Sequence, residues 1–416
     1  MATSNNNAAS SNSAAENAGA RIRRARRTKK MNQATLAGLV GRSESWMRGI
    51  EAGRIRLDKH SVIERLADVL DVDEAWLLGL PFEFGEDLGH SAVPALREAL
   101  RRTSMILSGH PRLPARAPRS SLKELRADVD RITRRRQAAN LLEVMRQLPE
   151  LTEMLNVSAL ETSGTERDAV LGLIVEISHV ARMVLNQLGY HDLAWIAVDN
   201  AATAATTLGD PLMTACSAWD RCGVLLHTDT LGEVITVAES AMTELQSQLD
   251  VPSPQALSLW GALNLRCAVA SARRHDANSA WAYLSEAEST ADRLDGERND
   301  FQTVFGTANC GIHAAEIAVE LHQPDIALRR HAGINLSSLT SKERHTRHLI
   351  DVARAHGQLS HDAAAVYQLK RAVALAPEYV YNHSMARSLV DQLRRRAQPS
   401  AIDAGLGAIE RAMGLA

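Results

Sequence analysis

The chain has 416 residues, which is too many for one ordinary domain, and its formal net charge at pH 7 is -2. Hydrophobic residues make up 45% and aromatic residues only 4%, so the chain can build a large core of closely packed helices rather than sheets. No signal peptide or long apolar run is present, and we therefore expect a soluble, cytoplasmic protein without a membrane partner. The four cysteines show no paired metal spacing and are predicted to be reduced core residues.

The charge is distributed unevenly along the chain. Residues 20–80 carry 13 lysines and arginines against 8 acidic residues, and residues 97–136 carry 12 against 4. Basic character that is concentrated in one region indicates a polyanionic partner.

The N-terminal region predicts a tail followed by two short helices joined by a turn. Residues 1–18 are rich in Ser, Asn and Ala, and we expect them to be disordered. Asn32 and Ser43 are placed to cap the two helices, and Gly41 lies where the chain must turn. Met47 and Ile50 supply the apolar face of the second helix, which ends before Gly53. This is the layout of a helix-turn-helix motif.

The stretch from residue 20 to 80 resembles the Cro/C1-type (Xre) helix-turn-helix domain of the lambdoid phage repressors. The matching positions are Asn32-Gln33-Ala34, Leu36-Ala37, Gly41, Ser43, Ile50-Glu51, Gly53 and the ending from Leu70 to Gly79. The resemblance implies a five-helix domain over residues 19–80 that binds double-stranded DNA. Residues 43–51 would be the recognition helix in the major groove, and Arg26 would pair with Glu51.

The same resemblance assigns candidate DNA contacts. The base-reading positions fall on Glu44, Ser45 and Gly49, with Arg48 beside them. Gly49 offers no side chain there, and Trp46 is expected to pack on the domain or to press on the DNA backbone. The remaining candidates, which would contact phosphates or begin the recognition helix, are Arg24, Arg27, Gln33, Ser43, Arg54, Arg56 and Lys59. For the basic cluster of residues 20–30, a solvated charged face is the alternative.

Residues 81–119 are predicted to be a linker. They contain three glycines and prolines interleaved with arginines, a composition that disfavours regular structure. We expect one short helix within it, at about 93–107. The basic side chains of this linker would lie along the DNA, or the segment would serve only as a soluble spacer.

Residues 120–416 predict a repetitive, entirely helical domain. Small residues mark successive copies at Ala194, Val234, Ala280, Ala327 and Ala365, which are 40, 46, 47 and 38 residues apart. The pattern resembles the tetratricopeptide repeat, whose usual period is ~34 residues. Residues 305–309 and 349–355 are also similar to stretches of actinobacterial regulators that join this helix-turn-helix to such repeats. The resemblance implies an all-α protein whose second domain is an α-solenoid of tetratricopeptide-like helix pairs, used for sensing or dimerisation.

The concave face of such a solenoid is a candidate ligand groove. The residues expected to line it are Glu176, His179, Asn186, Trp219, Asn309, Glu316, Arg347 and Arg354. By analogy with regulators of this architecture, the ligand would be a peptide or a small molecule. A plain solvated surface is the alternative for each residue.

Enzyme signatures are not found in the sequence. It has no phosphate-binding glycine loop, zinc-ligand spacing or nucleophile elbow, so we expect no catalytic residues, cofactor or metal. We therefore predict a homodimeric, sequence-specific transcription regulator that binds inverted repeats and senses a signal. The alternative is a regulator whose repeats serve only dimerisation or protein contacts.

Overall fold

The computed structural model describes residues 18–29, 31–52, 62, 65–66, 69–70, 90–110, 117, 120–228, 230–250, 252–339, 341–396, 399, 404–413 and 415. These residues are mostly helical, and the predicted all-α class is confirmed. The chain divides into two compact units, Met1–Leu88 and Gly89–Ala416, which are described separately. Most of the predicted tail and the loop with Arg54, Arg56 and Lys59 lie outside the described residues.

The first unit contains the predicted pair of short helices. Helix α1 spans Ala18–Thr28, α2 spans Gln33–Leu39 and α3 spans Glu44–Glu51. The Asn32 side chain accepts a hydrogen bond from the Thr35 N–H at 2.7 Å, and the Ser43 hydroxyl accepts one from the Trp46 N–H at 3.2 Å. Gly41 has a φ of +67° in the turn, a conformation that favours glycine. The caps and the turn thus form where the sequence predicts them.

A small apolar core joins the helices of the first unit. The helical spacing of Leu36, Leu39 and Val40 predicts that all three lie on one apolar face. Leu36 and Val40 are buried, but Leu39 is 46% exposed. The prediction is wrong for Leu39, because this side chain lies on the solvent side of α2. The core is completed by Ile22, Ala25, Ala37, Met47, Ile50, Val62, Leu66 and Leu70.

The second unit starts earlier than the sequence predicts. A short 3-10 helix, His90–Ala92, leads into α6, Val93–Leu107, where the short linker helix was expected. Helix α6 packs against α8 and α10, with Leu96, Leu100 and Ile106 buried. Its apolar face requires a partner surface, so this helix belongs to the repeat unit and not to a linker.

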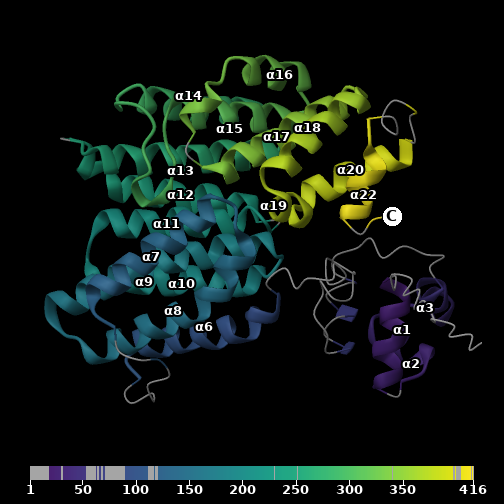
Figure 1. Ribbon diagram of the computed structural model, residues 1–416, viewed down its shortest axis with the longest axis horizontal. Helices are drawn as coiled ribbons and strands as arrows, with labels where there is room; N and C mark the ends of the chain where they lie inside the picture. Colours follow the sequence, from purple (N-terminus) through teal and green to yellow (C-terminus); the bar gives the residue numbers. More distant parts are fainter. Residues whose placement is uncertain are drawn as a thin grey trace, which may run out of the picture. The chain divides into compact units, whose positions relative to one another are not determined.

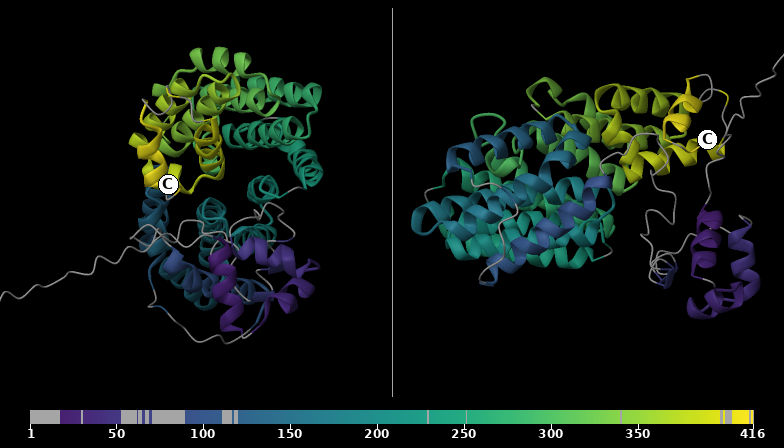
Figure 2. Two further views of the ribbon diagram at one scale, coloured as in Figure 1. Left: turned by 90° about the vertical axis from the view of Figure 1, so that its right-hand side faces the viewer. Right: turned by 60° about the horizontal axis from the view of Figure 1, so that its bottom comes forward.

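Antiparallel helix pairs follow one another through the second unit (Figures 1 and 2). The pairs are α7 (Leu122–Gln137) with α8 (Leu141–Glu161), α9 (Gly164–Gln187) with α10 (His191–Leu208), α11 (Pro211–Leu225) with α12 (Leu231–Leu245), α13 (Pro254–Arg273) with α14 (Ala277–Ala291), α15 (Thr307–Glu320) with α16 (Pro324–Ala332), and α17 (Lys342–Gln358) with α18 (Asp362–Leu375). The chain ends with α19 (Pro377–Asn382), α20 (Ser384–Arg396) and α22 (Leu406–Ala412). This arrangement is a helical repeat body.

The small residues that mark the repeats lie at the pair interfaces. Ala194, Val234, Ala280, Ala327 and Ala365 all fall in the second helix of a pair, and each is at most 1% exposed. Small side chains at these positions let the paired helices approach closely. The four cysteines are free and buried in the same helical body, as predicted.

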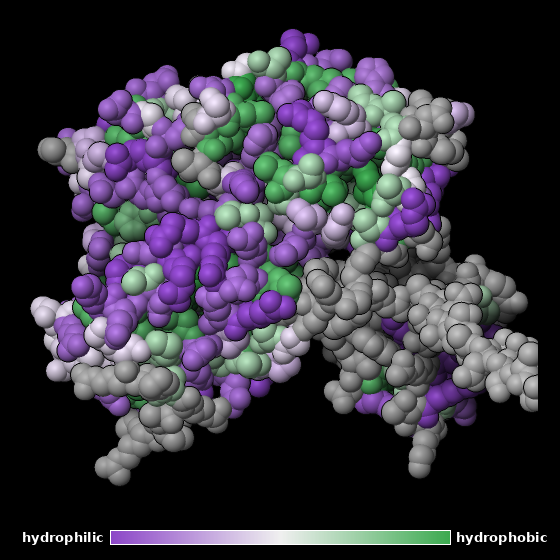
Figure 3. Space-filling model, viewed as in Figure 1, coloured by the Kyte–Doolittle hydropathy of each residue, from purple (hydrophilic) through white to green (hydrophobic). Residues whose placement is uncertain are grey.

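The surface of the second unit is mainly polar. Hydrophilic residues cover much of its visible face, with apolar patches between them (Figure 3). Among its described residues, the large apolar side chains that remain exposed are Met105, Trp195 and Tyr367. None of the helices in the described parts of the chain is both long and apolar enough to cross a bilayer.

Early and late helices of the repeat unit also touch each other, which the sequence did not predict. Helix α7 contacts α17, and α8 contacts α19. Arg136 donates to Glu343 at 2.5 Å, the Leu142 N–H donates to Glu378 at 3.0 Å, and Gln187 donates to the Tyr379 carbonyl at 2.8 Å. We call these three hydrogen bonds the closing contacts. They close the inner face of the repeats at one end.

Candidate nucleic-acid interface and ligand cavity

One face of α3 is free to meet another molecule. Glu44, Ser45 and Arg48 are exposed, whereas Met47 and Ile50 on the opposite face are buried in the core. Arg48 donates to the Glu44 carboxylate at 2.9 Å, and the Ser45 hydroxyl lies 3.0 Å from that of Ser43. The predicted base-reading side chains of Glu44 and Ser45 therefore share one solvent-facing surface with Arg48, and this surface carries both donors and acceptors.

Two other recognition-helix positions face inward. Trp46 is half-buried against the core, and the Arg42 guanidinium lies 5.6 Å from its ring centroid. Of the two alternatives for Trp46, packing on the domain is the one observed. Gly49 is buried. Arg42, which the sequence did not single out, thus places an additional cation beside the recognition helix.

A hydrogen-bonded ion pair fixes α1 against α3. Arg26 donates to both oxygens of Glu51, at 2.6 and 2.9 Å, and also to the Met31 carbonyl at 2.7 Å. The pairing that the family resemblance implies is therefore present. Although burial acts to raise the pKa of Glu51, hydrogen bonds from Arg26 and Gln33 hold it below its ordinary value. Gln33 donates one of its two amide N–H groups to Glu51 at 2.7 Å, so a phosphate contact by its amide would use the second N–H.

Few of the predicted phosphate contacts can be located. Arg27 is exposed on α1, where its guanidinium is accessible to a phosphate. Arg24 also lies in α1, but its side chain falls outside the described part of the structure, as do Arg54, Arg56 and Lys59.

The repeat unit holds a cavity of about 130 Å³ on its inner side, which we call the arginine cavity. The first helices of successive pairs line it, together with α19 and the segment between α7 and α8. Six arginines contribute to the lining, against two carboxylates, those of Glu316 and Glu343. The arginines are Arg136, Arg182, Arg266, Arg273, Arg344 and Arg347.

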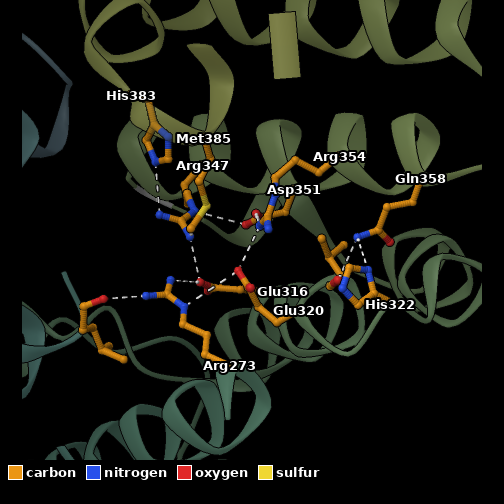
Figure 4. A network of polar contacts seen from close by, with 12 residues as sticks. Arg273, Glu316, Glu320, His322, Arg347, Asp351, Arg354, Gln358, His383 and Met385 are labelled. Carbon is orange, nitrogen blue, oxygen red and sulfur yellow. Dashed lines mark hydrogen bonds and ion pairs between the residues drawn. The ribbon is translucent and has the colours of Figure 1, made fainter. Parts of the chain in front are cut away.

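Four of these arginines have carboxylate partners. Arg136 contacts Glu343, and Arg182 contacts the fully buried Asp220 at 2.5 Å. Glu316 lies between the other two, 2.7 Å from Arg347 and 3.5 Å from Arg273 (Figure 4). Burial acts to raise the pKa of Glu316, but Arg347, His313 and Arg273 hold it well below the ordinary value.

The other two arginines lack such a partner. Among the described residues, no carboxylate lies within 4.0 Å of the Arg266 or Arg344 side-chain nitrogens. Arg266 lies over the Trp219 ring at 4.7 Å, and its Nε is buried without an acceptor. Within the described ranges, the hydrogen bond that Arg344 donates from its side chain goes to the Thr303 carbonyl, at 3.4 Å. Within the described part of the chain, two positive charges of the cavity therefore have no direct carboxylate contact.

The predicted groove residues are separated into three groups. Asn186, Glu316 and Arg347 line the arginine cavity. Glu176 and His179 line a neighbouring hollow. Trp219, Asn309 and Arg354 are not part of the lining: Trp219 and Asn309 are buried, and Arg354 pairs with Glu320 at 3.1 Å and Asp351 at 2.9 Å.

Sequence reasoning missed five of the six cavity arginines, namely Arg136, Arg182, Arg266, Arg273 and Arg344. A signal for one of them was available. Arg266 is a single cation in the apolar run Leu-Asn-Leu-Arg-Cys-Ala-Val-Ala of residues 263–270, where a charged residue lacks a packing role.

The first unit matches a known family. Residues 18–77 match the family model described as a helix-turn-helix domain. No curated protein matches the sequence. The crystal structure of Bacillus thuringiensis PlcR in complex with the peptide PapR7 and DNA is similar over 68% of this chain and 96% of that chain, with 11% identity and a TM-score of 0.33. Residues 18–77 therefore contain a helix-turn-helix domain.

Proposed function

We propose that the protein is a sequence-specific transcription regulator that binds operator DNA with α3 and senses a peptide or small molecule with its repeat unit. The observation that carries the DNA-binding part is the exposed face of Glu44, Ser45 and Arg48 on a helix whose opposite face is buried. Carboxylate, hydroxyl and guanidinium groups on one face can read base edges in the major groove.

Substitutions on this face should change which sequences are bound. Glu44→Gln replaces an acceptor suited to the cytosine amino group by an amide suited to adenine, and it removes the partner of Arg48. We expect Glu44→Gln and Ser45→Ala each to alter the preference at a base position by ~1–3 kcal/mol. Bound sequences would be selected from a random duplex library and ranked by fluorescence anisotropy.

Arg27→Gln serves as the contrasting variant in the same domain. Arg27 is exposed on α1, and loss of a phosphate contact weakens all sequences alike and reduces the salt slope by about 1. If Glu44→Gln and Ser45→Ala rank every base variant as the parent does, α3 is not the reading helix.

We propose further that the protein acts as a homodimer held together by the repeat unit. A single α3 has too few exposed side chains to specify an operator. A two-fold dimer doubles the number of base pairs that are read, and its symmetry requires inverted half-sites. Light scattering should give twice the chain mass for the free protein, and the mass of two chains plus one duplex for the complex with DNA. A monomer in both states would contradict the dimer.

The sensing role competes with a repeat unit that only dimerises. The unpaired charge of the arginine cavity favours a ligand, because a surface used only for dimerisation does not need buried cations without partners. A DNA-binding titration with and without extract of the source cells separates the two roles. Extract-dependent affinity supports sensing, and an unchanged affinity supports dimerisation alone.

A further inference from the structure

We propose that the arginine cavity binds a small molecule with at least two negative charges on carboxylate or phosphate groups, held by Arg266, Arg344 and Arg182. This inference rests on the proposed function, in which the repeat unit binds a signal, and it names the chemical class of that signal.

The first argument is the charge balance of the cavity. Glu343 is engaged by Arg136, Asp220 by Arg182, and Glu316 by Arg273 and Arg347. Asp351 and Glu320 are engaged by Arg347 and Arg354 in the adjoining network (Figure 4). After these pairings, the charges of Arg266 and Arg344 remain. Two uncompensated cations call for a ligand with two or more negative charges.

The second argument is that the arginines repel one another. Burial, followed by the neighbouring charges of Arg182 and Arg344, lowers the pKa of Arg266 to about 9. Burial is also the main cause that lowers the pKa of Arg344, and Glu343, the carboxylate that most opposes this shift, is already in contact with Arg136. A protein core gains nothing from such an arrangement, since an apolar side chain would fill the same volume without the desolvation cost.

The third argument is that the backbone makes room for these groups. A Cβ atom at Gly223 would lie 2.8 Å from an Arg182 Nη atom and 3.4 Å from an Arg266 Nη atom. Any side chain at residue 223 would therefore displace the Arg182 guanidinium group and would come into contact with that of Arg266. Asn186 fixes this stretch of backbone by donating to the Gly223 carbonyl at 3.2 Å. The two cations are thus held close together in one corner of the cavity.

Size and shape select the ligand class. A cavity of about 130 Å³ is similar to the engineered ~150 Å³ cavity that holds one benzene molecule, so it suits a small molecule better than a peptide of several residues. Planar guanidinium groups match the paired oxygens of carboxylates and phosphates, to which they donate two parallel hydrogen bonds.

Isothermal titration calorimetry on the full chain in low-chloride buffer tests the proposal. The probes are inorganic phosphate, glycerol 3-phosphate and citrate, with glycerol as the neutral control. We expect saturable binding of at least one anionic probe and none of glycerol. A response to the two phosphates identifies phosphate as the recognised group, and a response to citrate alone identifies carboxylate.

Three variants locate the site. Arg266→Gln and Arg344→Gln remove the unpaired charges from two different helices, and each should weaken probe binding at least tenfold. Arg274→Gln removes an exposed charge next to Arg266's own helix α13 and should leave binding unchanged. Because Arg266 lacks a carboxylate partner, Arg266→Gln without probe should melt no lower than the parent, whereas a structural role predicts a lower Tm.

The outcomes keep this inference apart from the proposed function. If no anionic probe binds the parent, or if Arg266→Gln and Arg344→Gln bind as the parent does, the anion site is wrong. Operator binding is measured separately on the same proteins. If the anion site is wrong but the parent binds operator DNA, the DNA-binding proposal still holds. If the parent does not bind operator DNA, the DNA-binding proposal is wrong.

Discussion

The repeat unit should lose stability steeply as the pH falls from 6.5 toward 4. Burial is the main cause that lowers the pKa of five histidines in this unit. The pKa is lowered to about 4 for His179 and His313, to about 3 for His227 and His348, and well below the ordinary value for His383. These side chains are neutral in the folded protein at neutral pH.

The sign of the effect follows from proton binding. Below pH 6.5 the unfolded chain takes up protons on these histidines while the folded chain does not, so acid favours unfolding. Their full contribution to stability is present above pH 6.5 and is lost as the pH falls to the folded pKa values. Each histidine contributes about 1.4 kcal/mol per pH unit in this window, or roughly 5–7 kcal/mol per pH unit for all five. Since domains have a total stability of only about 5–15 kcal/mol, we expect unfolding before pH 4.

Urea unfolding of the full chain at pH 7.5, 6.5 and 5.5, followed by circular dichroism, measures this dependence. His313→Gln should reduce the slope by about one proton, because one buried imidazole no longer titrates. Val319→Ala, a buried apolar change in the same helix α15, should lower stability equally at every pH and so serves as the control. A free energy of unfolding that stays constant between pH 7.5 and 5.5 would contradict the prediction.

Asp220→Asn should destabilise the repeat unit by about 3–5 kcal/mol, the usual cost of removing one partner of a buried ion pair. Asp220 is fully buried on α11 and accepts hydrogen bonds from His179 at 2.7 Å and from Arg182 at 2.5 and 3.1 Å. Burial acts to raise the pKa of Asp220, yet His179 and Arg182 hold it well below its ordinary value. Without this carboxylate, Arg182 becomes a further unpaired cation beside Arg266.

Chemical denaturation of the parent and variant chains checks this value. Glu288→Gln is the matched control, because its pair with Arg330 is solvent-exposed at 3.1 Å and should be worth no more than about 1 kcal/mol. Adding Arg182→Gln to Asp220→Asn should recover part of the loss, since the stranded charge is then absent. Equal effects of Asp220→Asn and Glu288→Gln would show that the buried pair contributes no more to the free energy of unfolding than the exposed pair does.

Local features of the fold could be predicted from the sequence. The helix caps at Asn32 and Ser43 and the turn at Gly41 involve only residues a few positions away. Their roles can therefore be predicted from the sequence. The same holds for Ala194 and its counterparts, because a repeating small residue reports the contact between neighbouring helices. These signals depend on spacing along the chain, which a single sequence contains.

Long-range contacts could not be predicted in this way. The sequence predicts that α6 is part of a linker, because nothing near this helix in the sequence shows that α8 and α10 cover its apolar face. The arginine cavity gathers side chains from five repeats and the α7–α8 segment, and its residues depend on the rotation of each first helix. For that reason Asn186, Glu316 and Arg347 line the arginine cavity, whereas Asn309 is buried and Arg354 pairs with Asp351.

The closing contacts have a consequence for the order in which the chain folds. Each helix pair forms from contacts between neighbours, so pairs can nucleate independently and extend along the array. Arg136 and Glu343, in contrast, are 207 residues apart and can meet only after the intervening pairs have stacked. Closure is therefore the final assembly step and the first to reverse when the native state fluctuates. Hydrogen exchange should be fastest, among the helices of the repeats, where α7 and α8 meet α17 and α19, and that transient opening gives solutes a route to the interior.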